Sequence, residues 1–212
     1  MARVNVYVDG FNLYFGALKD HPDLKWLDLA ALAKRLLKDD DTVNQIRYFT
    51  ARIDSRGDPQ APQRQETYLR ALRTIPNLSI DYGRFKTRTK MQRLANPPAS
   101  GPKRVEVLVT EEKGSDVNLA THLLWDAFNG EGSTSLVISG DTDLVRPIEV
   151  VARRLNRKVG VVNGTLNAAP SHELVRVASW IKRLRIGVLR DSQFPESLSD
   201  STGTFRRPAG WT

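Results

Sequence analysis

The sequence of 212 residues predicts an α/β fold of three layers with a mostly parallel central sheet. Segments with strand patterns alternate with segments with helix patterns along most of the chain. Ser135–Ser139 (SLVIS) is a short apolar strand of the kind that is buried in a parallel sheet. Arg3–Val8 is a second strand, because Val4, Val6 and Val8 share one of its faces.

The first half of the chain supplies several elements in order. Helices are expected at Phe11–Leu18, Leu29–Leu37 and Pro59–Leu72, and strands at Asn44–Ala51, Leu78–Phe85 and Val105–Val109. Asp28 is in position to cap the second of these helices. The last two strands flank a basic segment and are candidates for a hairpin around it.

The second half continues the alternation. A helix is expected at Val117–Phe128, with Val117, Ala120, Leu124 and Phe128 on one side. The apolar strand is followed by a helix at Leu144–Leu155, a strand at Lys158–Val162 and a helix at Glu173–Ala178. From about residue 191 the composition shifts to Ser, Pro, Gly, Thr and Asp, which predicts a domain over residues 1–190 and a flexible tail over 191–212.

Composition excludes several classes of protein. The chain has no cysteine, so disulfide scaffolds, thiolate zinc sites and cysteine nucleophiles are ruled out. No apolar run approaches the roughly 18 residues of a membrane span, and Asp9 interrupts the N-terminal apolar stretch too early for a secretory signal. We therefore expect a cytoplasmic protein without a membrane partner; the sequence leaves open whether it forms a homo-oligomer.

Positive charge is concentrated in one segment. The 32 Lys and Arg against 24 Asp and Glu give a net charge of +8, and Arg84 to Val105 holds seven basic residues and no acidic one. Such a segment is typical of a polyanion binder, although a solvated loop is the alternative. If the segment is extended, one face carries four of its cations: Arg84, Lys86, Arg88 and Lys90. That face would form a rail for a phosphate backbone.

The common catalytic motifs are missing from the sequence. It has no P-loop, no GxGxxG after a strand and no GxSxG turn. The three histidines, His21, His122 and His172, show no metal-ligand spacing, and we interpret His122 as a structural residue. Histidine-based hydrolysis is therefore disfavoured.

Aspartates stand where the predicted strands end. Asp9 follows the first strand, Asp141 and Asp143 follow the apolar strand, and Asp116 begins a helix that can reach the same edge. Ligands of open parallel sheets bind outside the carboxyl ends of the strands. Helix capping and turn chemistry explain each acid singly. Together, however, two carboxylates about 4 Å apart repel by roughly 4 kcal/mol at an effective dielectric of 20, which a divalent cation would relieve. Oxygen ligands suit Mg²⁺ or Mn²⁺.

Three blocks around these acids carry a family resemblance. VDGFNLY (Val8–Tyr14), EEKGSDVNLATHLL (Glu111–Leu124) and SGDTDLVRPI (Ser139–Ile148) resemble, in order and spacing, the signature blocks of the NYN domain, a family of the PIN-like nuclease group. The resemblance covers about residues 3–185 and implies a Rossmann-like (PIN-like) sheet, an acidic metal pocket and ribonuclease activity. It maps the metal-site acids onto Asp9, Asp116, Asp141 and Asp143, with Asn12 as a polar residue beside them.

These observations favour a Mg²⁺- or Mn²⁺-dependent endoribonuclease acting on single-stranded or structured RNA. The four aspartates would bind metal directly or through water, and Asn12 would hydrogen-bond a carboxylate or the phosphate, or else cap a helix. Ser139 would brace the pocket and Lys113 would contact phosphate. A phosphatase of the haloacid-dehalogenase type fits poorly, because Phe11 stands where its second acid is needed. The alternative outside enzymes is an RNA-binding or assembly module with a vestigial acidic pocket.

Overall fold

The computed structural model describes residues 1–166 and 168–211 and is built on a six-stranded sheet in which every pair of neighbours is parallel. The strands run in the order β3-β2-β1-β6-β7-β8. Their bounds are β1 (Arg3–Asp9), β2 (Thr42–Thr50), β3 (Leu78–Tyr82), β6 (Thr134–Ile138), β7 (Lys158–Asn163) and β8 (Trp180–Arg183). The predicted α/β fold with a mostly parallel sheet is confirmed; β8 was not expected, because it is short and ends in charged residues.

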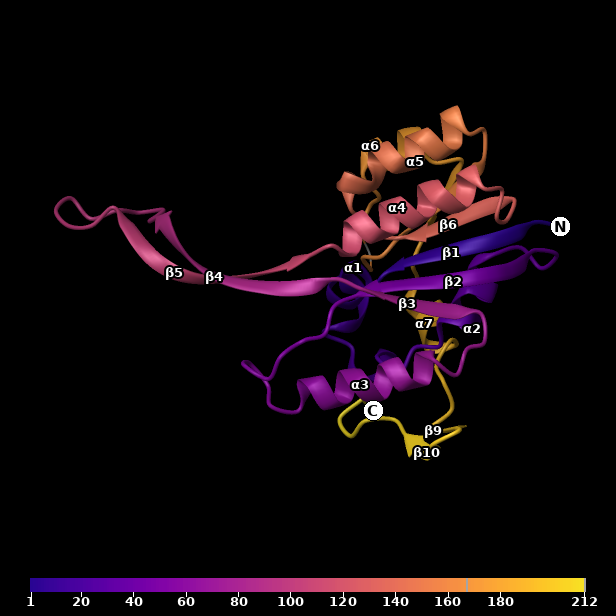
Figure 1. The fold of residues 1–212 in the computed structure, drawn as a ribbon, viewed down its shortest axis with the longest axis horizontal. Coiled ribbons are helices and arrows are strands. Elements are labelled where there is room, and N and C mark those ends of the chain that lie inside the picture. Colours follow the sequence, from indigo (N-terminus) through magenta and orange to yellow (C-terminus); the bar gives the residue numbers. More distant parts are fainter. Residues whose placement is uncertain (167, 212) are drawn as a thin grey trace.

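Helices cover both faces of the sheet (Figure 1). One face carries α1 (Gly10–Leu13), α2 (Leu29–Leu36), α3 (Ala61–Leu72) and α7 (Ile186–Arg190); the other carries α4 (Ser115–Phe128), α5 (Val145–Glu149) and α6 (His172–Val177). Successive side chains of β1 point to opposite faces of the sheet, so this strand contributes to both halves of the core. Val4, Val6 and Val8 pack against the first group of helices, and Tyr7 packs against the second. No helix in the described residues is long and apolar enough to cross a bilayer.

The helix α4 presents a different face to the core than its apolar pattern predicts. The buried residues are Leu119, Leu123 and Ala127, whereas Val117 is 68% and Phe128 72% exposed. The helix is rotated so that Asp126 also points inward, where Arg47 neutralises it. The prediction that Val117 and Phe128 belong to the buried face of this helix was wrong. The buried ion pair between Arg47 and Asp126 helps to decide which face of α4 points to the core.

A two-stranded arm projects from the body (Figure 1). It consists of β4 (Arg84–Arg93) and β5 (Arg104–Lys113), paired antiparallel along their whole lengths. The hairpin expected between Leu78–Phe85 and Val105–Val109 was wrong in its first strand, because Leu78–Tyr82 joins the central sheet and the basic segment itself pairs with β5. Gly83, between β3 and β4, anchors its base by donating its N–H to the Thr50 carbonyl at 2.7 Å. Gly114, between β5 and α4, takes a left-handed conformation (φ 109°) that favours glycine.

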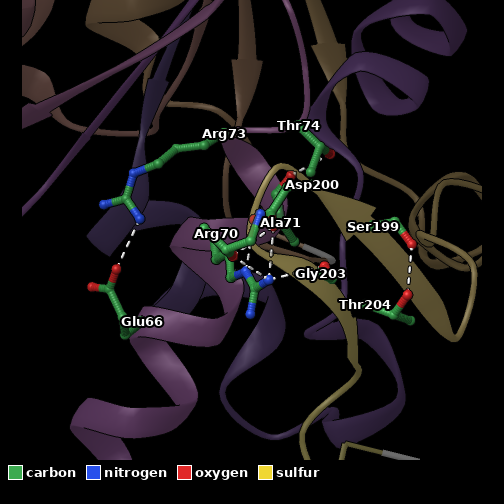
Figure 2. A network of polar contacts seen from close by, with 10 residues as sticks. Glu66, Arg70, Ala71, Arg73, Thr74, Ser199, Asp200, Gly203 and Thr204 are labelled. Atoms are coloured by element: carbon green, nitrogen blue, oxygen red, sulfur yellow. Dashed lines mark hydrogen bonds and ion pairs between the residues drawn. The ribbon is translucent and has the colours of Figure 1, made fainter.

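The C-terminal segment packs on the body instead of forming the flexible tail that its composition predicts. It contains β9 (Ser197–Asp200) and β10 (Gly203–Arg206), which form a hairpin beside α3. Arg70 of α3 pairs with both carboxylate oxygens of Asp200, at 2.7 and 2.8 Å, and also reaches the Gly203 carbonyl (Figure 2). Its guanidinium lies 4.1 Å from the Phe205 ring centroid. These contacts hold the segment on the body although its composition is polar on average, so the folded unit extends past residue 190.

Candidate metal centre

Three acids from distant parts of the chain converge at one edge of the sheet. Asp9 ends β1, Asp141 follows β6, and Asp116 is the second residue of α4. One carboxylate oxygen from each lies within 4.8 Å of the other two. Because the chain passes from β1 to one half of the sheet and later returns to β6 on the other side of β1, this edge is the topological switch point.

Ser139 joins two of these acids from the end of β6. Its hydroxyl donates to Asp9 Oδ2 at 2.9 Å and accepts the N–H of Asp141 at 3.1 Å. Both Ser139 and Asp9 are almost fully buried, at 1% and 3% exposure. The bracing role expected for Ser139 is therefore seen directly in these hydrogen bonds.

Asn12 holds the loop that carries Asp141. Its backbone N–H donates to Asp9 Oδ1, and its side-chain oxygen accepts the N–H of Gly140, both at 2.9 Å. Gly164 packs so closely that a Cβ there would lie 2.5 Å from the same side-chain oxygen. The structure thus gives Asn12 a positioning role; the cap of α1 is Asp9, so the alternative in which Asn12 caps the helix was wrong.

The electrostatics of the cluster disfavour three bare charges. Burial raises the pKa of Asp9, and the charge of Asp141 raises it further, against the opposing effect of its hydrogen bonds. The pKa of Asp116 is raised to about 6. Burial is the largest cause, and the negative charges of Asp9, Asp141, Glu112 and Asp143 raise this pKa further. Within the described residues, no Lys, Arg or His forms an ion pair with the three clustered acids. An all-oxygen set of this kind fits a hard divalent cation.

Two further acids lie at the margin of the cluster. Asp143 is exposed and is not one of the three converging acids; its backbone N–H donates to Oδ1 of Asp141 at 2.9 Å, so Asp141 caps the short turn that contains it. Glu112, which sequence reasoning missed, accepts from the N–H and the hydroxyl of Ser115 at 3.2 and 2.8 Å. The available signal was an acid just before the helix, although the helix begins at Ser115 and not at Val117 as predicted. His122 contacts Asp81, at 3.3 Å, and is not one of the clustered residues.

The predicted cation rail lies on one face of the arm. Arg84, Lys86, Arg88 and Lys90 alternate along β4, which is extended as the rail requires. Glu111 on the neighbouring strand pairs with Arg88 at 3.1 Å and with Lys90 at 2.7 Å. It also pairs with Lys113, at 3.3 Å. Among the described residues, Arg84 and Lys86 are therefore the rail cations that form no ion pair.

A row of aromatic rings connects the arm to the acidic edge. Phe85 at the base of β4 meets Phe11 edge-to-face, with ring centroids 5.6 Å apart. Phe11 lies two residues after Asp9 and its ring is stacked 6.4 Å from that of Phe15, which is 61% exposed. Sequence reasoning did not identify this row, since its members come from separate elements.

Comparisons with known proteins give a family match and two informative relatives. The family model described as the NYN domain matches residues 3–182. The 6-hydroxy-3-succinoylpyridine 3-monooxygenase HspA of Pseudomonas putida (strain DSM 28022 / S16) is 27% identical over 238 residues, covering 99% of this chain and 75% of that protein. A crystal structure of a protein of unknown function from Vibrio parahaemolyticus RIMD 2210633 superposes with a TM-score of 0.58 at 16% identity, covering 91% of this chain and 96% of that one. At that identity the likeness supports the fold alone.

Proposed function

The chain belongs to the NYN domain family, which is nuclease-like, and we propose that it hydrolyses RNA phosphodiester bonds with the help of Mg²⁺ or Mn²⁺. The observation that carries the proposal is the convergence of Asp9, Asp116 and Asp141 at the switch point of the sheet with no cationic side chain paired to them in the described residues. A divalent cation would supply the missing positive charge.

Each residue of the site has a role that follows from its contacts. The three clustered aspartates would hold the cation, which when bound lowers the pKa of water and stabilises charge on a phosphate. Ser139 keeps Asp9 and Asp141 in register through its two hydrogen bonds. Asn12 fixes the loop at Gly140. Asp143 and Glu112 add negative charge at the rim and could bind waters of the cation.

The arm and the aromatic row are suited to hold the substrate. Arg84 and Lys86 form no ion pair in the described part of the chain and would contact phosphates. Phe85, Phe11 and Phe15 offer faces and edges on which unpaired bases stack, which favours single-stranded stretches of RNA. Lys113, which pairs with Glu111, would be the weaker phosphate contact.

The test is cleavage of a mixed RNA substrate during titration with Mg²⁺ and Mn²⁺. We expect metal-dependent cleavage by the wild type and by Asp39→Asn, a matched change at an exposed acid of the α2–β2 loop. Asp141→Asn keeps the side-chain shape and removes one charge, so it should abolish cleavage. Full turnover by this variant at saturating metal contradicts the proposal. Wild-type RNA binding without cleavage at any metal concentration would instead support a non-catalytic RNA-binding module.

A second candidate function comes from the relative that is named a monooxygenase. The observation that favours it is the extent of the match: it covers 99% of this chain, including the C-terminal segment that the NYN family model leaves out. Oxygenation of a hydroxypyridine would then be the activity. It is tested by mass spectrometry of 6-hydroxy-3-succinoylpyridine incubated with the protein, isotopically labelled oxygen and a reductant. One labelled oxygen atom should enter the ring at carbon 3, and because this carbon carries the succinoyl group, the ring product should have lost that side chain.

A further inference from the structure

A separate cavity lies beside α1. Its volume is about 170 Å³, and it is formed between α1, the start of α3 and the end of β2. The C-terminal segment contributes Trp211 to its wall. Gly10, which directly follows Asp9, also lines it, as do Phe11 and Phe15 of the aromatic row. None of the three clustered acids lines the cavity, so it adjoins the candidate metal centre without including it.

The walls of this cavity are aromatic and held rigidly. Tyr48 and Tyr68 meet edge-to-face, with ring centroids 6.3 Å apart, and Tyr68 lies 6.1 Å from Trp211. The Tyr68 hydroxyl donates to the Leu27 carbonyl at 3.0 Å, so its ring presents apolar surface to the cavity. Such a box, concave and mostly apolar with few polar groups, is typical of a small-molecule site.

Two cationic side chains complete the lining. Lys25 places its ammonium nitrogen 5.7 Å from the Tyr14 ring centroid and forms no ion pair among the described residues. Arg64 pairs with Asp58, and its side chain is 26% exposed. Burial and the charge of Arg64 both lower the pKa of Lys25, against a smaller opposing effect of Asp20. An anion beside Lys25 would relieve this repulsion.

We propose that this cavity binds a single six-membered aromatic ring that carries one anionic group. The ring would lie among Tyr48, Tyr68 and Trp211, and the anion beside Lys25 and Arg64. The size supports one ring, since a cavity of about 150 Å³ holds benzene, whereas a nucleotide with its sugar and phosphate is considerably larger. Aromatic acids have this chemistry. The proposal does not rest on hydrolysis at the acidic edge.

The experiment is calorimetric titration of the full chain with benzoate, benzamide and uridine monophosphate. Benzamide has nearly the shape of benzoate without its charge. We expect saturable binding of benzoate and at least tenfold weaker binding of benzamide. Uridine monophosphate also carries a six-membered ring and an anion, but it is too large for the cavity and should not displace benzoate. Absence of benzoate binding at millimolar concentration, or displacement of benzoate by uridine monophosphate, overturns the proposal.

Variants then locate the bound anion. Lys25→Gln should weaken its binding at least tenfold, while Lys38→Gln, the same change at an exposed lysine outside the cavity, should leave it unchanged. Ala61→Leu, at the first turn of α3, fills the cavity while keeping both cations and should abolish binding. Thermal melting shows whether each variant is folded. Undiminished binding by both folded cavity variants would place the anion elsewhere and refute the assignment.

Discussion

Replacing Asp116 by asparagine should make the metal-free protein more stable. The pKa of Asp116 rises from its ordinary 3.8 to about 6 in the folded chain, mainly through burial and then through the charges of Asp9 and Asp141. At about 1.4 kcal/mol per pH unit, keeping this side chain ionised above pH 6 costs ~3 kcal/mol. The carboxyl is only partly buried, so solvent screening reduces the cost to about 1.5 kcal/mol. Asparagine has the same shape and does not ionise.

The sign of the effect fixes its pH dependence. Because the folded-state pKa is raised, the stability associated with Asp116 is fully present below pH 4 and is lost as the pH rises through 6. In EDTA at pH 7.5, Asp116→Asn should therefore melt about 3–6 °C above the wild type. The difference should shrink steadily between pH 6 and pH 4.

Thermal denaturation at several pH values, with and without Mn²⁺, measures both parts of this argument. Mn²⁺ should raise the melting temperature of the wild type by mass action and should have far less effect on the variant. Asp143→Asn, at an exposed acid outside the converging three, is the matched control and should change the metal-free melting temperature less. A metal-free variant that is no more stable than the wild type at pH 7.5, or a gain that is the same at pH 4, would refute the reasoning.

Three other predictions follow from the fold and the arm. Asp126→Ala should lower the free energy of unfolding by about 3–5 kcal/mol in chemical denaturation, because it leaves the Arg47 guanidinium unpaired inside the protein. Trp26 is buried against Phe194 and Phe205 of the C-terminal segment, with ring centroids 5.7 and 6.4 Å away. Deleting residues 191–212 should therefore lower the melting temperature and expose Trp26, measured as a red shift of tryptophan fluorescence; an unchanged melting temperature would show that the segment adds no stability. Replacing Arg84 and Lys86 together by alanine should flatten the dependence of log RNA affinity on log salt by about 1.4, given about 0.7 per phosphate contact on a single strand, and an unchanged slope would exclude the rail.

Much of the candidate metal centre was predictable from the sequence, because one topological rule places it. Once Val8 and Ile138 are recognised as ends of parallel strands, Asp9 and Asp141 must reach the same edge. The position of Asp116 followed from the helix that begins beside it. Asp143 could not be placed in this way, since the direction of its side chain depends on the tight turn in which Asp141 caps its N–H.

The parts that sequence reasoning missed depend on contacts between distant residues. Which face of α4 points to the core depends in part on Arg47, which lies on β2 and pairs with Asp126. The C-terminal hairpin is ordered by Arg70, whose partner Asp200 is 130 residues away. Neither contact leaves a periodic signal, and the composition of residues 191–212 indicates disorder when it is averaged.

Among the described residues, Asp126 and Asp9 are the two buried aspartates, and the difference between their surroundings bears on function. Asp126 is fully buried, yet the protein gives it Arg47, the Tyr7 hydroxyl at 2.9 Å and the Gln45 amide at 3.0 Å. A fold that can place an arginine against one buried acid could place another at the switch point. There it places Ser139 and backbone N–H groups, which orient carboxylates without neutralising them. Three oriented carboxylates without a counter-charge repel one another unless a proton or a cation neutralises them, which is why the missing arginine is the strongest argument for a metal centre.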